Sequence, residues 1–261
     1  MIDLNSRMDK NFDDLAENLK LGVYGSGKGK VRLSVLKYDI TRNIPEIECK
    51  KNLSILDAGG GMGQISRWLA AKGHEVLLAD VSEQMLAIAK EENIKESLQD
   101  KIKIVRAAIQ ELPQLLKGQT FDLILLHGVI EWMENPIEGF ECLIPLLKPN
   151  GVVSLLFHNL DKLIMKWGIN SQYEKALPGK PCKTKKLTPS NSLSYRDLEP
   201  VFDKNRFDVV SKAGVRIFYG FFAKLTTEAV DETFELEKKY LYTEPFASMG
   251  EHIHYILRKK S

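Results

Sequence analysis

The sequence predicts an α/β protein built on a Rossmann-like, doubly wound and mostly parallel sheet of seven strands. Short apolar runs alternate with helical patterns across residues 53–157, with short connections between them, as is typical of a parallel sheet covered by helices. The first apolar run leads directly into a glycine-rich turn and then into a helical pattern. A buried strand, a tight turn and a helix N-terminus in this order form the first half of a βαβ unit.

The other elements follow from local patterns. Helices are expected over 11–21 and 30–44, separated by the glycine-rich segment 22–29, and we interpret 1–45 as an N-terminal lid. After the first strand, at 53–56, further strands are expected at 74–80, 101–106, 121–126, 152–157, from 207 onward and at 252–257. Helices are expected at 136–147, from 194 onward and at 228–242. Residues 159–193 read as an insertion after the fifth strand, with a helix at 159–177 and a basic loop. The chain, 1–261, is interpreted as a single domain.

The glycine turn discriminates between cofactors. Asp57 precedes an alternating series of Gly59, Gly61 and Gly63, with Gly60 between them. A dinucleotide fingerprint, G-x-G-x-x-G, would need glycine in its third place, where this chain has glutamine or serine. An acidic residue at the strand end suits a cofactor with an ammonium and a sulfonium group and would repel a pyrophosphate. The pattern therefore resembles the first motif of the Rossmann-like S-adenosylmethionine (SAM) methyltransferases, with Asp57, Gly59 and Gly60 as cofactor-binding candidates.

The ends of the next strands supply further candidates. Asp80 ends the second strand and can accept hydrogen bonds from two ribose hydroxyls; the alternative is that it caps the following helix. Ala108 and Ile109 follow the third strand, where small residues admit a flat adenine ring, and packing within the turn is the alternative. His127 ends the fourth strand, at the edge where open α/β sheets bind ligands, although a lone histidine is often structural.

Composition excludes few functions. The 261 residues are 44% hydrophobic and 28% charged with a net charge of +2, which is ordinary for a soluble protein and too small to imply nucleic acid. His252 and His254 share a strand face without a third ligand nearby, and the three cysteines are far apart, so no metal is expected. Without an apolar signal core or a membrane-spanning run, we expect a cytoplasmic protein that does not bind membranes.

Lysines are concentrated in the insertion. Four occur within seven positions, among prolines that hold the loop open: Lys180, Lys183, Lys185 and Lys186. A charge run is often only a solvated surface. Because this loop follows the fifth strand, above the cofactor edge, contact with phosphates is the competing interpretation.

Several stretches together resemble one family, the bacterial tRNA 5-carboxymethoxyuridine methyltransferases, which are class I SAM-dependent enzymes. They are Tyr24-Gly-x-x-Lys28-Gly-x-x-Arg32, residues 56–64, His127-x-Val-x-Glu131-Trp132, Leu187-Thr-x-Ser190, Gly214-Val-Arg-Ile-Phe218 and the tail from Leu236 to His254. The resemblance implies SAM bound by Arg32, Gly59, Gly60, Asp80, the backbone near Ile109 and His127, with S-adenosylhomocysteine as product. Met62 and Glu111 depart from the family pattern.

The resemblance also implies the reaction, in which the carboxylate of 5-carboxymethoxyuridine, at the wobble position of the tRNA anticodon, becomes a methyl ester. A carboxylic acid with a pKa near 4 is ionised at neutral pH, so no general base is required and we name no catalytic residue. Arg216 is the candidate to hold the carboxylate bidentately, with an ordinary strand-edge arginine as the alternative. Tyr195, Phe218 and Tyr219 are candidates to stack on a base.

Other functions remain open at this point. A SAM-dependent carboxyl O-methyltransferase of a small free acid would need the same cofactor residues but no lysine loop. A SAM-binding sensor would need no substrate. A non-catalytic RNA-binding module would leave Asp57, the glycines and Asp80 without a purpose. No obligate protein partner is indicated.

Overall fold

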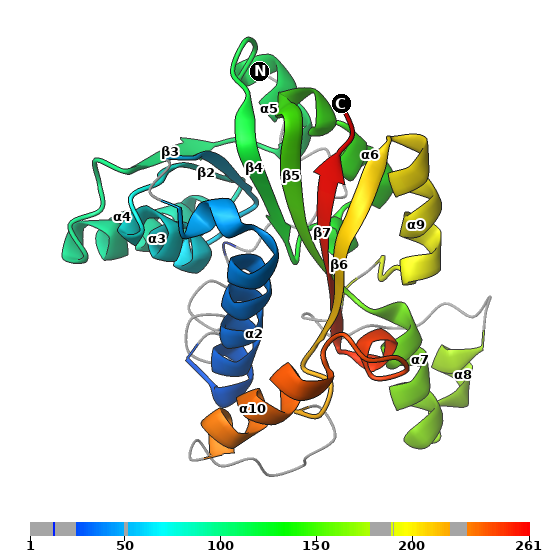
Figure 1. Cartoon of the computed structure of the whole chain (residues 1–261). Coiled ribbons are helices and arrows are strands. Elements are labelled where there is room, and N and C mark those ends of the chain that lie inside the picture. Colours follow the sequence, from blue (N-terminus) through cyan, green and yellow to red (C-terminus); the bar gives the residue numbers. More distant parts are fainter. Residues whose placement is uncertain (1–12, 14–24, 50–51, 178–188, 190, 220–228) are drawn as a thin grey trace.

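The computed structural model describes residues 13, 25–49, 52–177, 189, 191–219 and 229–261 (Figure 1). Within them lies one seven-stranded sheet with the order β3-β2-β1-β4-β5-β7-β6. The strands are β1 (Ser54–Ala58), β2 (Glu75–Asp80), β3 (Ile102–Arg106), β4 (Phe121–His127), β5 (Leu147–His158), β6 (Phe207–Val215) and β7 (His252–Lys259).

The sheet is mostly parallel, as predicted. Strands β1 to β5 pair in parallel, and β7 pairs antiparallel with both β5 and β6. Strand β7 therefore runs against the others, and β6 runs with them. The chain proceeds outward from β1 to β2 and β3, then returns to β4 on the other side of β1. Open sheets of this kind bind ligands at the carboxyl ends of the strands beside this reversal.

Helices cover both faces of the sheet (Figure 1). One apolar cluster joins the sheet to α2 (Gly27–Asn43), α3 (Gln64–Ala71) and α4 (Glu83–Lys95). A second joins the other face to α5 (Leu112–Leu115), α6 (Pro136–Glu141) and α9 (Tyr195–Lys204). Beyond the carboxyl ends of the parallel strands lie α7 (Leu160–Ile169), α8 (Tyr173–Ala176) and α10 (Val230–Tyr240). Short 3₁₀ turns are η3 (Pro45–Ile47), η4 (Ile109–Glu111), η5 (Ile130–Trp132), η6 (Ile144–Leu146) and η8 (Ala247–Met249).

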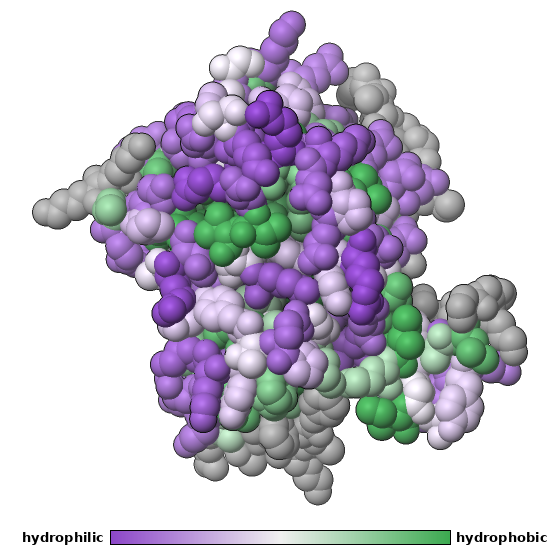
Figure 2. Space-filling model, turned by 45° about the vertical axis from the view of Figure 1, so that its right-hand side comes forward, coloured by the Kyte–Doolittle hydropathy of each residue, from purple (hydrophilic) through white to green (hydrophobic). Residues whose placement is uncertain are grey.

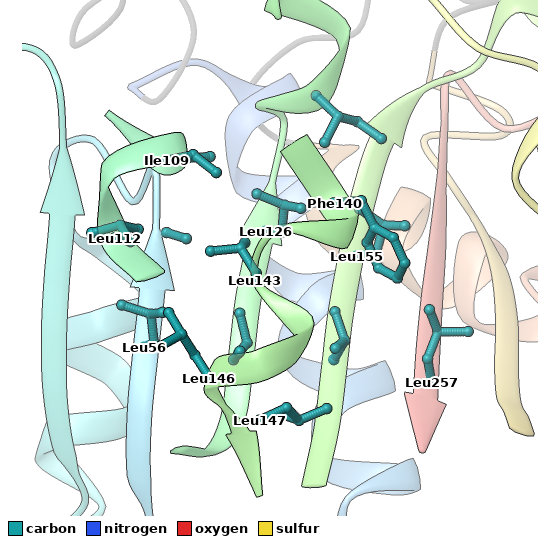
Figure 3. Close-up of a cluster of buried hydrophobic side chains, with 14 of the residues drawn as sticks. Leu56, Ile109, Leu112, Leu126, Phe140, Leu143, Leu146, Leu147, Leu155 and Leu257 are labelled. Atoms are coloured by element: carbon teal, nitrogen blue, oxygen red, sulfur yellow. The ribbon is translucent and has the colours of Figure 1, made fainter. Parts of the chain in front are cut away.

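Leucine dominates the core on the second of these faces (Figure 3). Leu56, Leu126 and Leu155 point from three adjacent strands toward Phe140 and Leu143, and all five side chains are at most 3% exposed. Burying a side chain of this size contributes about 1.5–3 kcal/mol. This packing makes the central strands rigid, so that their carboxyl ends are fixed platforms for functional side chains.

Three predicted helices have different bounds in the structure. Helix α2 starts at Gly27 instead of residue 30, and Gly27 packs closely against Tyr219, whose hydroxyl would lie 2.9 Å from a Cβ added there. The helix predicted over 136–147 ends at Glu141, and Pro145, which lacks an N–H, lies in η6. The helix predicted over 159–177 is divided into α7 and α8 at Ser171, whose φ is +56°.

For the remaining elements, the predicted bounds are closer to those in the structure or cannot be compared with it. Strand β5 begins at Leu147, earlier than the predicted residue 152. The helix predicted over 11–21 lies outside the described residues except for Asp13. No helix in the described ranges is both long and apolar enough to span a lipid bilayer.

Candidate functional site

The predicted cofactor residues are brought together along one edge of the sheet. Four neighbouring strands, β3, β2, β1 and β4, end side by side at this edge. Arg32 comes from α2 on the lid side. The others follow or end these strands: Asp57, Gly59, Gly60, Asp80, Ala108, Ile109 and His127.

The glycine turn after β1 is hydrogen-bonded to the end of β2. The N–H groups of Gly59 and Gly60 donate to the Ala79 carbonyl at 2.7 and 3.1 Å. Gly59 has φ +73°, and a Cβ there would lie 2.5 Å from the Val129 side chain. Side chains are thus excluded by both conformation and space. At Gly61, whose φ is +55°, a Cβ would meet only the Met85 sulfur at 3.5 Å and the Asp80 carboxylate at 4.0 Å.

Asp80 joins two loops at the end of β2. Its Oδ2 accepts the Gly61 N–H at 2.8 Å, and its Oδ1 accepts the Ser82 N–H at 2.9 Å. Burial raises the pKa of Asp80, and these two hydrogen bonds oppose the rise. The N-cap of α4 is Ser82, whose hydroxyl accepts the Met85 N–H. Asp80 is therefore not the helix cap, and its carboxylate still has acceptor capacity for a ligand hydroxyl.

Asp57 lies beneath the glycine turn. It is 3% exposed, and the Ser66 hydroxyl of α3 donates to its Oδ2 at 2.6 Å. Burial raises the pKa of Asp57 to about 7; the Ser66 hydrogen bond opposes this rise, and the charge of Asp80 adds to it. The structure thus gives Asp57 a second role, as the anchor between the turn and α3, and its contact with a cofactor stays a prediction.

Ala108 and Ile109 form the start of η4. The Ala108 N–H donates to the Glu111 carboxylate at 2.8 Å, so the glutamate that departs from the family pattern closes this turn. Ile109 is buried. Because β3 pairs with β2, with Arg106 opposite Asp80, both residues lie beside the Asp80 edge. An adenine contact here also stays a prediction.

His127 is held by a neighbouring strand. Its Nε2 lies 2.8 Å from the Ser154 hydroxyl of β5. Burial, and then the charges of His254 and Arg32, lower the pKa of His127 well below its ordinary value. The imidazole is therefore neutral at physiological pH and does not repel a cationic ligand.

Positive charges gather next to this edge around Arg216, directly after β6. Arg216 has a left-handed backbone, with φ +59°. Its Nε is shielded from water and has no hydrogen-bond partner among the described residues. Burial, and after it the charge of Arg32, lower its pKa, whereas Glu251 opposes the shift. Lys28 experiences the same field, since burial and the charges of Arg216 and Arg32 lower its pKa.

Carboxylates fix the backbone around Arg216. The fully buried Glu237 of α10 accepts the N–H groups of Ile217, Phe218 and Tyr219 at 2.8, 2.9 and 3.3 Å. Burial acts to raise the pKa of Glu251, but the nearby His158 and the charges of Arg216 and Lys166 hold it well below the usual range. Glu251 is therefore anionic and balances part of the positive cluster.

Four residues of this region were missed by the sequence analysis as site residues. Glu131 is 2% exposed, accepts the His158 N–H at 3.2 Å and has a buried second oxygen without a hydrogen-bond partner among the described residues. Burial raises its pKa to about 6. His252 packs edge-on against His158, with ring centroids 5.5 Å apart. The fourth is Glu251. Glu131 had a local signal, its place in the motif that begins at His127, and Glu251 and His252 lie within the tail that carries the family resemblance.

Two predictions cannot be followed in the structure. The lysine cluster, Lys180, Lys183, Lys185 and Lys186, lies outside the described residues. No group of three or more potential metal-ligating side chains occurs among the residues that are described, and the expected absence of a metal stays a prediction. His254, instead of facing a metal, bonds to Ser154 and Asp39.

A sheet of this order, with a glycine turn after β1 and a carboxylate at the end of β2, defines the Rossmann-like methyltransferases. The family model described as "Methyltransferase domain" matches residues 56–155. The magnesium protoporphyrin IX methyltransferase of Synechocystis PCC 6803, solved with bound S-adenosylhomocysteine, is similar in fold. Its TM-score is 0.64 at 15% identity, covering 95% of this chain and 96% of that chain.

Within this class one relative matches almost end to end. The tRNA 5-carboxymethoxyuridine methyltransferase of Escherichia coli (strain K12) is 33% identical over 254 residues, covering 96% of this chain and 97% of the relative. The chain belongs to this family of methyltransferases. A malonyl-[acyl-carrier protein] O-methyltransferase of Enterobacter lignolyticus (strain SCF1) matches over only 109 residues, at 32% identity, covering 42% of this chain and 40% of that relative.

The buried Asp57 makes stability depend on pH. The folded state keeps the Asp57 proton up to a pKa of about 7, against an ordinary value of 3.8. As pH rises from about 4 to 7, this group therefore lowers the free energy of unfolding, by at most about 1.4 kcal/mol per pH unit. Asp57→Asn removes this contribution. In urea unfolding, the wild-type value minus the variant value should fall across this range. A difference as flat as that for the exposed Asp100→Asn would contradict the assignment.

Proposed function

We propose that the chain transfers a methyl group from SAM to the carboxylate of 5-carboxymethoxyuridine at the wobble position of a tRNA anticodon. The products are the methyl ester, 5-methoxycarbonylmethoxyuridine, and S-adenosylhomocysteine. The observation that carries this proposal is Arg216, whose buried Nε lacks a partner among the described residues, within a cluster of cations next to the glycine turn. A buried donor without an acceptor costs about 1–3 kcal/mol, so this arrangement favours an anionic ligand.

The residues at the sheet edge fit SAM. The turn leaves an open side at Gly61 facing the Asp80 carboxylate, which can accept ribose hydroxyls. Asp80 can provide negative charge for a cation, and Arg32 can bind the amino-acid carboxylate of the cofactor. When bound, SAM supplies a methyl group that is activated by its positively charged sulfur.

The role of this chain's own residues is binding and orientation. Arg216 holds the ionised carboxylate and directs one oxygen toward the cofactor edge. A new C–O bond replaces the C–S bond of the methyl group and no proton is released, so no general base is needed. Orientation of this kind can supply roughly 7–11 kcal/mol of the barrier. Glu237 contributes indirectly, because it fixes the turn that carries Arg216.

The insertion after β5 offers a surface for RNA. Helices α7 and α8 form a projecting lobe on which apolar and polar patches adjoin (Figure 2). Tyr173 and Leu177 are 61% and 58% exposed, and Lys166 on α7 is also exposed, with its ammonium 3.8 Å from Glu251. Exposed aromatic rings can stack on unpaired bases, while lysines contact phosphates. We propose that this lobe and the adjoining lysines, Lys180, Lys183, Lys185 and Lys186, contact the anticodon region. Such a substrate places the protein in the cytoplasm.

A second candidate function is methylation of a small free acid. The partial match to a malonyl-[acyl-carrier protein] O-methyltransferase supports it, since Arg216 would hold any carboxylate. This function would not explain the projecting α7–α8 lobe or the lysine cluster. A SAM-binding sensor would leave Arg216 without a ligand.

The first test is direct. Purified protein is mixed with SAM and bulk tRNA that contains 5-carboxymethoxyuridine, and the digested nucleosides are analysed by mass spectrometry. The proposal expects a uridine heavier by one methylene, which mild alkali converts back to the acid. If S-adenosylhomocysteine accumulates while every nucleoside is unchanged, the small-acid function replaces the tRNA assignment. If neither product forms although SAM binds, the result supports the alternative that the chain is a SAM-binding sensor without catalytic activity.

Arg216→Ala should lower kcat/KM for the modified tRNA roughly 100-fold or more, because two charge-assisted hydrogen bonds to the carboxylate are lost. SAM affinity, measured by calorimetry, should stay near the wild-type value. Arg206→Ala is the matched control, since Arg206 has the same left-handed φ of +59° but precedes β6, and it should retain activity. Full turnover by Arg216→Ala at low tRNA concentration would show that another group holds the carboxylate.

Replacement of Lys180, Lys183, Lys185 and Lys186 with alanine should weaken tRNA binding and flatten its dependence on salt, since each phosphate contact contributes about 0.7–0.9 to the slope of log K against log salt. SAM binding should be unchanged. Electrophoretic mobility shifts over a range of salt concentrations measure the slope. An unchanged slope would mean that the lysines are only a solvated surface.

A further inference from the structure

An aspartate from the N-terminal part of the chain is bonded to the loop that follows Asp80. Asp13 Oδ1 accepts the Ser82 hydroxyl at 2.6 Å and the backbone N–H of Gln84 at 3.1 Å. Asp13 and Ser82 are 69 positions apart in the chain, and transfer of a methyl group to a carboxylate does not by itself require their contact. The contact brings a residue from far upstream of β1 to the cofactor edge.

Asp13 completes the hydrogen bonding at the start of α4. The first N–H groups of a helix have no partners within the helix. In α4 the Ser82 hydroxyl accepts the Met85 N–H at 3.1 Å, and Asp13 accepts that of Gln84. The Ser82 hydroxyl thus accepts from the helix and donates its own proton to Asp13. A carboxylate in this place is also favoured by the helix dipole.

Ser82 connects Asp13 with Asp80. The Ser82 N–H donates to Asp80 Oδ1 at 2.9 Å, while its hydroxyl donates to Asp13. Ser82 is 1% exposed. The other Asp80 oxygen, Oδ2, is bonded to the glycine turn through the Gly61 N–H. The orientation of the Asp80 carboxylate therefore depends on the glycine turn at one oxygen and on the Ser82 loop at the other. Burial raises the pKa of Asp80, and the charge of Asp13 adds to the rise, so the two carboxylates are near neighbours.

We propose that Asp13 is a positioning residue of the cofactor site, which holds Ser82 and, through it, the Asp80 carboxylate in the orientation that accepts the ribose hydroxyls of SAM. The inference rests on the proposed cofactor site, to which Asp80 belongs. By thermodynamic linkage, a ligand that binds Asp80 in this orientation also stabilises the contact that Asp13 makes. The alternative is that Asp13 only caps α4, in which case it contributes to stability and not to SAM affinity.

Asp13→Ala should weaken SAM binding about tenfold, because Ser82 and Gln84 each lose a charge-assisted hydrogen bond. Asp13→Asn keeps an oxygen acceptor and should restore SAM affinity to within about threefold of the wild type. Calorimetry with SAM measures both, and urea unfolding measures stability. Lower stability of Asp13→Ala with unchanged SAM affinity would overturn the proposal. Equal losses of affinity in both variants would also overturn it, because they would assign the effect to charge.

Glu83→Ala is the matched control. It removes the same charge from the same helix end, since Glu83 lies in the first turn of α4. Its carboxylate, however, is bonded to Arg106 at 2.6 Å and not to Ser82. The control should keep the SAM affinity of the wild type. If it lost as much affinity as Asp13→Ala, negative charge at the helix N-terminus would explain the result, and Asp13 would have no positioning role.

The wild-type protein allows a test that needs no variant. The Gln84 amide proton is held by Asp13, so its exchange with solvent, followed by NMR, reports on the contact. SAM should slow this exchange severalfold. An exchange rate that saturating SAM leaves unchanged would overturn the proposal even if Asp13→Ala failed to fold. None of these measurements uses tRNA, so a protein that methylates no tRNA but shows the expected exchange and affinities would retain this role of Asp13.

Discussion

The structure depends on the pairing of ionisable groups that burial has removed from water at the carboxyl edge of the sheet. Asp80 accepts backbone N–H groups from both loops beside it. Glu131 bonds to the backbone at the end of β5, and Glu237 to the turn that carries Arg216. A buried carboxylate must be satisfied, because an unpaired one costs several kcal/mol. Here the hydrogen-bond donors are backbone N–H groups of the loops at the sheet edge. The buried carboxylates therefore also fix the conformation of those loops.

The charges at this edge are divided by sign. The Asp80 carboxylate lies beside the glycine turn, whereas Arg32, Lys28 and Arg216 act on one another on the lid side. In the proposed reaction, the cationic cofactor would be attracted to one half and the anionic substrate to the other. Because the two halves adjoin, oppositely charged ligands are brought next to each other. The neutral His127 at the boundary between them favours neither sign.

Local sequence patterns were sufficient to predict those parts of the site whose structure depends on residues close together in the chain. The glycine turn and the acidic end of β2 were predictable, because strand, turn and helix signals are contiguous there. The contact between Asp39 and His254 was not, since 215 residues separate them and no periodicity links them. Gly27 shows a related limit: glycine disfavours helix, yet Gly27 begins α2 and packs closely against Tyr219, which is distant in the sequence.

The proposed reaction removes both charges that this edge attracts. Transfer of the methyl group converts a sulfonium into a neutral thioether and a carboxylate into a neutral ester. In the proposed site, the attraction of Asp80 for one ligand and of Arg216 for the other would be weakened in the same step. Charge-assisted hydrogen bonds are worth about 1.5–3 kcal/mol, against about 0.5–1.5 for neutral ones. In the proposed reaction, Arg216 would therefore hold the ester more weakly than the carboxylate that it replaces, which favours release of the methylated product.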